Sequence, residues 1–158
     1  PPRSTLFPYT TLFRSIYGAG DESETLKKRC EEEEITNVIF KGRVDKQYVP
    51  SILKKAYVNI LHNSSTSLDK YGQSQNKLFE YLAAGKCIVQ TYNPGYNVCE
   101  KCECGISAPI QNPEEIAKAV IEACRDEERN YIMGKNARED DFQSSKRVWR
   151  FLLEKMII

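Results

Sequence analysis

The residues best suited to chemistry lie within residues 71–86, which read YGQSQNKLFEYLAAGK. Ser74 is a candidate N-cap for a helix that begins at Asn76. Asn76 and Lys77 would then occupy the first turn, where backbone N–H groups have no partner within the helix. Glu80 follows Asn76 by four residues and Lys77 by three, so the three side chains share one helix face. The segment therefore predicts a polar surface that starts at the beginning of a helix.

This arrangement suits a ligand that carries a diphosphate and a diol. The helix dipole and Lys77 favour negative charge at the helix start, and the Glu80 carboxylate can accept hydrogen bonds from two vicinal hydroxyls, as of a ribose. The structural alternative is an ordinary amphipathic helix with a solvated polar face. In both cases the helix ends at Ala84, before Gly85, and four apolar side chains are left to pack inward: Leu78, Phe79, Leu82 and Ala83.

A second candidate is the glycine pair Gly18 and Gly20, which follows an expected strand and precedes an expected helix. Glycines at such a turn let a ligand approach the backbone closely. The third glycine of a dinucleotide fingerprint is missing, and the acidic residues that follow would repel a phosphate placed directly on the helix start. A tight strand-to-helix turn is the structural alternative.

Cys99, Cys102 and Cys104 could offer three thiolates to zinc or to an iron–sulfur cluster. A fourth ligand is not evident, because His62, the single histidine, lies on a different segment. Small, partly buried thiols around a helix end are the alternative, and we predict no metal. His62 follows an expected strand, at the edge where α/β folds bind ligands, and we expect it to line the cleft as a loop residue.

These candidates must be positioned by alternating strands and helices. Short apolar runs predict strands at residues 16–17, as the tail of a longer strand, and at 38–40, 58–61, 87–90 and 105–107. Stretches of helical period predict helices at 22–34, 47–56, 76–84 and from 113 onward. In the last of these, one stripe is expected to face inward: Ile116, Ala117, Val120, Ile121 and Cys124. Strands without clean alternation are typical of a parallel sheet covered on both faces. The fold class is therefore α/β, a Rossmann-like parallel sheet flanked by helices.

After residue 127 the chain is expected to be helical to its end, with a stripe of Val148, Phe151, Leu152, Lys155 and Met156.

The first fifteen residues repeat Thr-Leu-Phe and resemble the translation of a sequencing adapter, so we interpret them as a non-native scar that contributes little to stability. A natural strand or linker is the alternative. The expected organisation is a scar at 1–15, a Rossmann-like domain at 16–140 and a C-terminal helix at 141–158.

Composition excludes several classes of function. The 158 residues suffice for one ordinary domain. A net charge of +1, from 23 basic and 22 acidic residues, gives no electrostatic reason to expect nucleic acid as a partner. Six cysteines without a cleavable signal favour reduced thiols in the cytoplasm over a secreted disulfide framework.

At residues 71–86 the chain resembles the retaining glycosyltransferases of the GT-B fold, a group that includes bacterial capsule and lipopolysaccharide sugar transferases. The resemblance runs from Ile16 to the end and includes the glycine pair, the NVIFKGRV segment, the signature helix and the helix start at Pro113. It implies that Glu80 holds the nucleotide ribose and that the turn after the second strand frames the base. The nucleotide site that it implies comprises Gly18, Gly20, Arg43, Val44, Tyr71, Gly72, Ser74, Asn76, Lys77, Leu78 and Glu80.

One position departs from the family pattern. Gly72 stands where a glutamate would hold the donor sugar, eight residues before Glu80. A glycine has no side chain to offer that sugar, and the loop instead resembles a subgroup with a Tyr-Gly-x-Ser pattern.

The resemblance implies the donor-binding half of a retaining, metal-independent transferase of the hexosyltransferase type. The donor would be a UDP-sugar, the acceptor a glycan or a lipid-linked glycan, and the further partner an N-terminal half of the same enzyme, without which the chain would be inactive. No cofactor is expected. The location would be cytoplasmic, with a peripheral position at the inner membrane through the other half as the alternative. A sugar-nucleotide 2-epimerase and a non-catalytic nucleotide- or metal-binding module are the rival functions.

Overall fold

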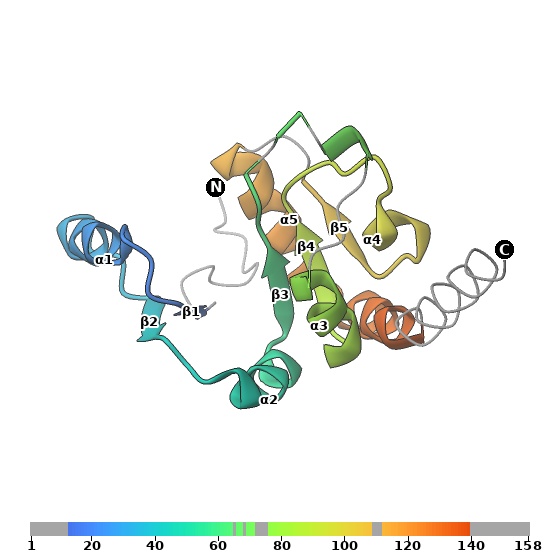
Figure 1. Ribbon diagram of the computed structural model, residues 1–158, viewed down its shortest axis with the longest axis horizontal. Coiled ribbons are helices and arrows are strands. Elements are labelled where there is room, and N and C mark those ends of the chain that lie inside the picture. The colour runs from blue at the N-terminus through green and yellow to red at the C-terminus, as the bar shows by residue number, and fades with distance from the viewer. Residues whose placement is uncertain (1–12, 65, 68, 72–75, 109–111, 140–158) are drawn as a thin grey trace, which may run out of the picture. The chain divides into compact units, whose positions relative to one another are not determined.

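The computed structural model describes residues 13–64, 66–67, 69–71, 76–108 and 112–139 (Figure 1). The chain forms two compact units, one up to Val49 and one from Pro50. Both units contain parallel strands joined through helices, which confirms the expected α/β class. The terminal stripe expected at Val148–Met156 and the expected helix at 141–158 lie outside the described residues. No helix in the described part is both long and apolar enough to cross a bilayer.

The first unit contains two parallel strands, β1 (Arg14–Tyr17) and β2 (Val38–Gly42), connected by the helix α1 (Ser23–Glu32). A short 3-10 turn at Lys46–Tyr48 follows. Strand β1 begins at Arg14, which agrees with the prediction that Ile16 and Tyr17 are the tail of a longer strand, and it pairs Arg14 with Val38. Arg14 and Ser15, which belong to the segment interpreted as a scar, therefore pair with Val38 and Ile39 of β2, and the non-native origin of residues 1–15 stays a prediction.

Helix α1 ends earlier than predicted. Glu34 has a φ of 53°, in the left-handed region that stops a helix. The N–H of Ile35 then donates to the carbonyl of Cys30 at 2.8 Å, which closes the last turn. The acidic run at residues 31–34 thus spans the helix end rather than lying inside the helix.

The second unit contains a three-stranded parallel sheet in the order β3–β4–β5. The strands are β3 (Val58–Leu61), β4 (Cys87–Gln90) and β5 (Gly105–Ser107). The helices are α2 (Val49–Lys55), α3 (Asn76–Ala84), α4 (Val98–Lys101) and α5 (Pro113–Arg125), and residues 127–139 are also helical. The predicted bounds of β3, β4, β5 and α3 are confirmed, whereas α4 was not predicted.

Strand β4 is the centre of this unit, and all four of its residues are buried. Its side chains alternate between two apolar clusters. Ile88 lies in a cluster with Leu78 and Leu82 of α3, and Cys87 and Val89 lie in another. The second cluster is completed from α5, the helix at 127–139 and the end of β5, with Ala119, Ala123, Met133 and Ala108. This arrangement confirms the expectation of a strand covered on both faces.

The inward face of α3 differs in part from the prediction. Leu78 and Leu82 are buried, and Tyr81 packs against the same cluster. Phe79 is 39% exposed, and Ala83 is exposed. Each helix residue turns the side-chain direction by about 100°, which places Phe79 and Ala83 well away from the stripe of Leu78 and Leu82. The prediction that these two residues pack inward is therefore wrong.

The inward stripe of α5 is also rotated relative to the prediction. Ala119 and Ala123 are buried, with Ile116 and Val120 beside them, whereas Ala117 is exposed. The small side chains face inward because the helix packs closely against the sheet, and larger residues at those positions would need more room. The helix start agrees with the sequence: Pro113 occupies the first turn, and the Asn112 side chain accepts the Glu114 N–H at 2.7 Å.

Two buried groups, Cys87 and Tyr92, make the free energy of unfolding fall at alkaline pH. Burial raises the pKa of the Cys87 thiol from 9.0 to about 12 and raises the pKa of the Tyr92 phenol from 10.0 to about 12. Both groups are neutral when protonated, so the folded chain holds their protons more tightly than the unfolded chain does. Their contribution to stability is therefore complete below about pH 9 and is lost as the pH rises toward about 12.

We expect the free energy of unfolding in urea to fall as the pH rises above about 9. The variant Cys87→Ala should lower stability at neutral pH but should lose less stability between neutral and alkaline pH, because one of the two groups is gone. Parallel alkaline slopes for the variant and the wild type would contradict this assignment.

Candidate functional site

The carboxyl ends of the three strands of the second unit lie in register. Leu61 of β3 stands opposite Gln90 of β4, and Gln90 stands opposite Ser107 of β5. Along the chain, β3 is followed by α3, and β4 is followed by the loop at residues 91–97 and then by α4. Open parallel sheets bind ligands at this edge, because the loops and the helix N-termini gather there.

A histidine and a threonine meet at this edge. The Nδ1 atom of His62 lies 2.7 Å from the Thr91 hydroxyl. Thr91 is fully buried, and its N–H donates to the Leu61 carbonyl at 3.1 Å, which continues the pairing of β3 and β4 by one residue. The His62 ring itself is exposed. A solvent-facing imidazole is thus held by a side chain that belongs to the interior.

Asn97 joins the same edge to α4. Its side-chain oxygen accepts the Glu100 N–H at 3.2 Å as an N-cap, and its Nδ2 donates to the Ser107 hydroxyl at 2.8 Å. Asn97 is buried, so both bonds form out of water. One side chain therefore fixes the start of α4 to the end of β5.

The two loops at the edge are joined directly. Asp69 is buried and accepts the Thr66 N–H at 3.1 Å and the Thr66 hydroxyl at 2.9 Å. The backbone carbonyl of Asp69 accepts the Gly95 N–H at 2.6 Å. A Cβ atom on Gly95 would lie only 2.0 Å from the Lys70 carbonyl oxygen. Only glycine fits there, so the β4–α4 loop is in close contact with the segment that leads toward α3.

Helix α3 presents the residues that the sequence singles out. Asn76 and Lys77 are exposed in its first turn, Leu78 is buried, and Glu80 is partly buried one turn along. Leu78 shares an apolar cluster with Leu61, the last residue of β3. The first turn of α3 therefore lies beside the carboxyl end of β3 (Figure 1).

The remaining predicted site residues fall in three places. Gly18 and Gly20 lie between β1 and α1, and the Gly18 N–H donates to the Gly42 carbonyl at 2.8 Å. Arg43 and Val44 follow the end of β2, so these four residues belong to the first unit. Tyr71 ends a short 3-10 turn that begins at Asp69. Gly72 and Ser74 lie outside the described residues.

Sequence reasoning missed Asp69, Thr91 and Asn97. Thr91 and Asn97 each carry a weak local signal, since Thr91 directly follows a predicted strand and Asn97 precedes a short helix that it caps. Asp69 could have been recognised from Thr66, three residues earlier, as the end of a local turn. None of these signals reveals the partner across the fold.

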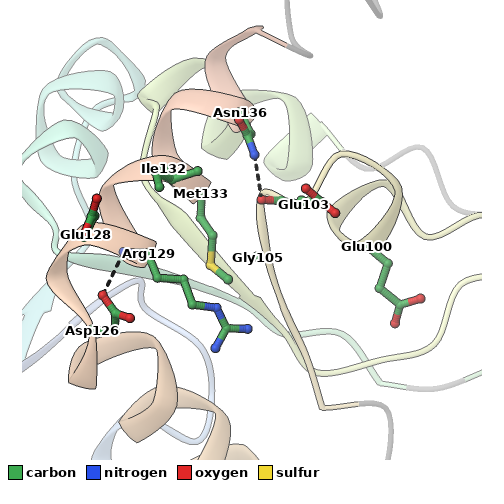
Figure 2. A pocket seen from close by; sticks show the side chains of 9 residues that line it. All are labelled: Glu100, Glu103, Gly105, Asp126, Glu128, Arg129, Ile132, Met133 and Asn136. Atoms are coloured by element: carbon green, nitrogen blue, oxygen red, sulfur yellow. Dashed lines mark hydrogen bonds between the residues drawn. The ribbon is translucent and has the colours of Figure 1, made fainter.

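A cavity of about 590 Å³ opens at a different place, near Gly105 at the amino end of β5 (Figure 2). Four acidic residues line it: Glu100, Glu103, Asp126 and Glu128. Its Arg129 is already paired with Glu122 at 2.6 Å. Excess negative charge repels a diphosphate. Electrostatics therefore favour the carboxyl edge over this cavity as a nucleotide site.

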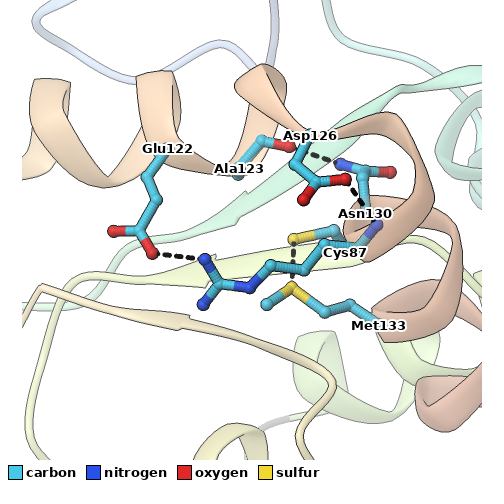
Figure 3. A network of polar contacts seen from close by, with 7 residues as sticks. Cys87, Glu122, Ala123, Asp126, Asn130 and Met133 are labelled. Atoms are coloured by element: carbon cyan, nitrogen blue, oxygen red, sulfur yellow. Dashed lines mark hydrogen bonds and ion pairs between the residues drawn. The ribbon is translucent and has the colours of Figure 1, made fainter.

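The cysteines behave as small apolar side chains. Cys99 and Cys104 are fully buried in the cluster of Leu61 and Ile88. The Cys87 thiol contacts the Met133 sulfur at 3.5 Å (Figure 3). Among residues 13–139, within the described ranges, no three His, Cys, Asp or Glu side chains gather so as to hold a metal ion. The three buried cysteines therefore pack as interior thiols.

The fold resembles that of solved glycosyltransferases. WaaG, a glycosyltransferase involved in lipopolysaccharide biosynthesis, aligns with a TM-score of 0.64 at 16% identity, over 80% of this chain and 33% of its own. HepE from Anabaena, in complex with UDP, aligns with a TM-score of 0.70 at 12% identity, over 90% and 41%. Sucrose-phosphate synthase from Thermosynechococcus elongatus gives 0.62 at 17% identity, over 89% and 38%.

The chain therefore spans between a third and about two fifths of the length of these proteins. No curated protein matches it by sequence. A family model described as "Glycosyl transferases group 1" matches residues 11–140, across both units. With the parallel α/β fold, the signature helix α3 and this match, the chain belongs to the group 1 glycosyl transferases.

Proposed function

We propose that this chain is the donor-binding half of a retaining glycosyltransferase that uses a UDP-sugar. One observation carries the proposal: the first turn of α3, with Asn76 and Lys77 exposed, lies beside the carboxyl end of β3. A glycosyl transfer from a nucleotide sugar leaves a nucleoside diphosphate, and the negative charge that develops on it needs fixed positive partners. The start of α3 offers backbone N–H groups and the Lys77 ammonium for that purpose.

The charges on the helices support this choice. Helix α1 carries Glu24 in its first turn, and α5 carries Glu114 and Glu115, where they complement the helix dipole. Helices α2 and α3 have no acidic residue in their first turns, and α2 continues directly from the 3-10 turn at Lys46–Tyr48. The dipole at the start of α3 can therefore attract an anion from outside the helix, whereas the starts of α1 and α5 would repel one.

Glu80 supplies the second half of the proposed site. It stands one turn after Asn76 on the same side of α3 and is partly buried. A carboxylate at this distance from a diphosphate suits the two hydroxyls of a ribose. UDP and UDP-glucose are bound by HepE, whose fold this chain shares, and we therefore propose uridine as the nucleoside.

The proposal includes no divalent metal and no cofactor, because the helix start and basic side chains would meet the leaving-group charge. The donor sugar would be held without a carboxylate at Gly72. The acceptor would be a glycan or a lipid-linked glycan in polysaccharide biosynthesis, and an N-terminal half of the enzyme would supply the remaining catalytic groups. We propose a cytoplasmic location, with that half reaching the inner membrane.

Calorimetric titration of the chain with UDP tests the proposal. A ligand that binds only the folded state stabilises it by about 2.7 kcal/mol at one hundred times its dissociation constant. We therefore expect heat on mixing and a rise in melting temperature with UDP, a smaller effect with uridine, and none with cytidine at equal concentration. Absence of both heat and a thermal shift at millimolar UDP would sink the proposal.

A further inference from the structure

His62 is held by a hydrogen bond to Thr91 that has no part in the proposed function. Its Nδ1 atom lies 2.7 Å from the hydroxyl of Thr91, a side chain with no exposed surface. The imidazole is exposed, and its Nε2 atom has no hydrogen-bond partner among the described residues. One nitrogen of the ring is therefore held by a buried side chain, and the other is left available to a ligand at this exposed position.

The position of the ring follows from its neighbours. His62 comes directly after Leu61, the last residue of β3, and Leu61 packs in one cluster with Leu78. Leu78 in turn follows Lys77 in the first turn of α3. His62 and Lys77 therefore each neighbour a member of the same apolar cluster in the sequence, and both are exposed. Figure 1 shows the end of β3 next to the start of α3.

The hydrogen bond to Thr91 also influences which nitrogen carries the proton. When the Thr91 hydroxyl donates to Nδ1, the proton of the neutral ring lies on Nε2. When the ring is charged, both nitrogens carry protons and Thr91 accepts from Nδ1. In these two forms Nε2 donates, whereas in the neutral tautomer with the proton on Nδ1 the ring donates to Thr91 and Nε2 accepts. An anionic oxygen near Nε2 would favour the two forms in which Nε2 carries a proton.

We propose that His62 donates from Nε2 to a phosphate oxygen of the nucleoside diphosphate, and that Thr91 is the positioning residue that orients its ring. The inference rests on the proposed function, since it concerns the same ligand. It adds a second side chain to the diphosphate site, from the β3 edge rather than from α3. It also gives the buried Thr91 hydroxyl a role that packing does not require, because a valine of the same shape would fill the space.

Titration of variants with UDP and with uridine tests this inference. We expect His62→Ala to weaken UDP binding about tenfold, as for the loss of one hydrogen bond to a charged group, and to leave uridine binding unchanged. Thr91→Val should weaken UDP by a smaller factor in the same selective way, and Thr91→Ser should bind as the wild type because the hydroxyl remains. Melting temperatures of all variants establish that each is folded.

The variant Lys77→Ala separates failure of the inference from failure of the proposed function. If Lys77→Ala weakens UDP and His62→Ala does not, the inference is overturned and the donor site stands. If His62→Ala weakens UDP and uridine alike, the residue does not act on the diphosphate and the inference is also overturned. If neither variant changes UDP affinity, the proposed site itself is wrong.

Discussion

Replacing Glu80 with alanine should weaken UDP binding by about one to two orders of magnitude, because hydrogen bonds to a charged group contribute roughly 1.5–3 kcal/mol. The proposed partner of Glu80 is the ribose, which UDP and uridine share, so Glu80→Ala should weaken both ligands alike. Lys77→Ala should weaken UDP more than uridine, since its proposed partner is the diphosphate. Calorimetry with the two ligands on the two variants gives four affinities that distinguish these roles.

Matched controls are available on the same unit. Glu128 is an exposed glutamate on the helix at 127–139 and lines the acidic cavity instead, and Lys54 is an exposed lysine of α2. Alanine at either position should leave both affinities unchanged, because bulk charge alone contributes little at physiological ionic strength. A loss of UDP affinity in Glu128→Ala equal to that in Glu80→Ala would refute a specific ribose contact.

Replacing Gly105 with alanine should lower the free energy of unfolding by roughly 3 kcal/mol or more, in the range of severe overpacking. A Cβ atom at this position would lie 2.1 Å from the carbonyl oxygen of Ile88 and 2.9 Å from its carbonyl carbon. Both residues are paired strand residues, Gly105 in β5 and Ile88 in the fully buried β4. The backbone therefore cannot move aside without breaking the sheet.

Thermal denaturation measures this effect, and we expect a decrease in melting temperature of roughly 6–12 °C for a chain of this size. Gly20→Ala is the control, because nothing lies within 4 Å of a Cβ atom built there. Its stability should stay within about 0.5 kcal/mol of the wild type. Equal melting temperatures for Gly105→Ala and Gly20→Ala would show that β5 can shift on β4.

The sequence predicted the second unit well where local pattern determines structure. The strands β3, β4 and β5 and the helix α3 have the predicted bounds, since short Val- and Ile-rich runs are separated by residues that stop or start helices. Gly85, predicted as the residue after α3, has a φ of 65°. The exposure of Phe79 could not be predicted, because several stripes of an apolar helix can face a sheet and packing selects one.

For the polar residues of the candidate site, too, local pattern predicted some features and missed those that depend on distant segments. Asn76, Lys77 and Glu80 were found because helix register is local, and their ligand remains a prediction. The contact of His62 with Thr91 joins residues 29 apart in the sequence, and the contact of Gly95 with Asp69 joins two different loops. Neither contact has a periodic signature, since each depends on how two strands are placed side by side. Such contacts become visible only once the sheet is assembled.

The close approach of Gly95 to Lys70 limits which sequences this edge can accept. The obstructing atom is the backbone oxygen of Lys70, which would lie 2.0 Å from the Cβ atom of any larger residue at position 95. Every amino acid carries that oxygen, so no replacement at position 70 could restore a variant such as Gly95→Ala. In a library randomised at both positions, residue 95 should therefore be recovered as glycine whatever residue stands at position 70. A clash between two side chains could be relieved by a second substitution, but a clash with a backbone oxygen cannot.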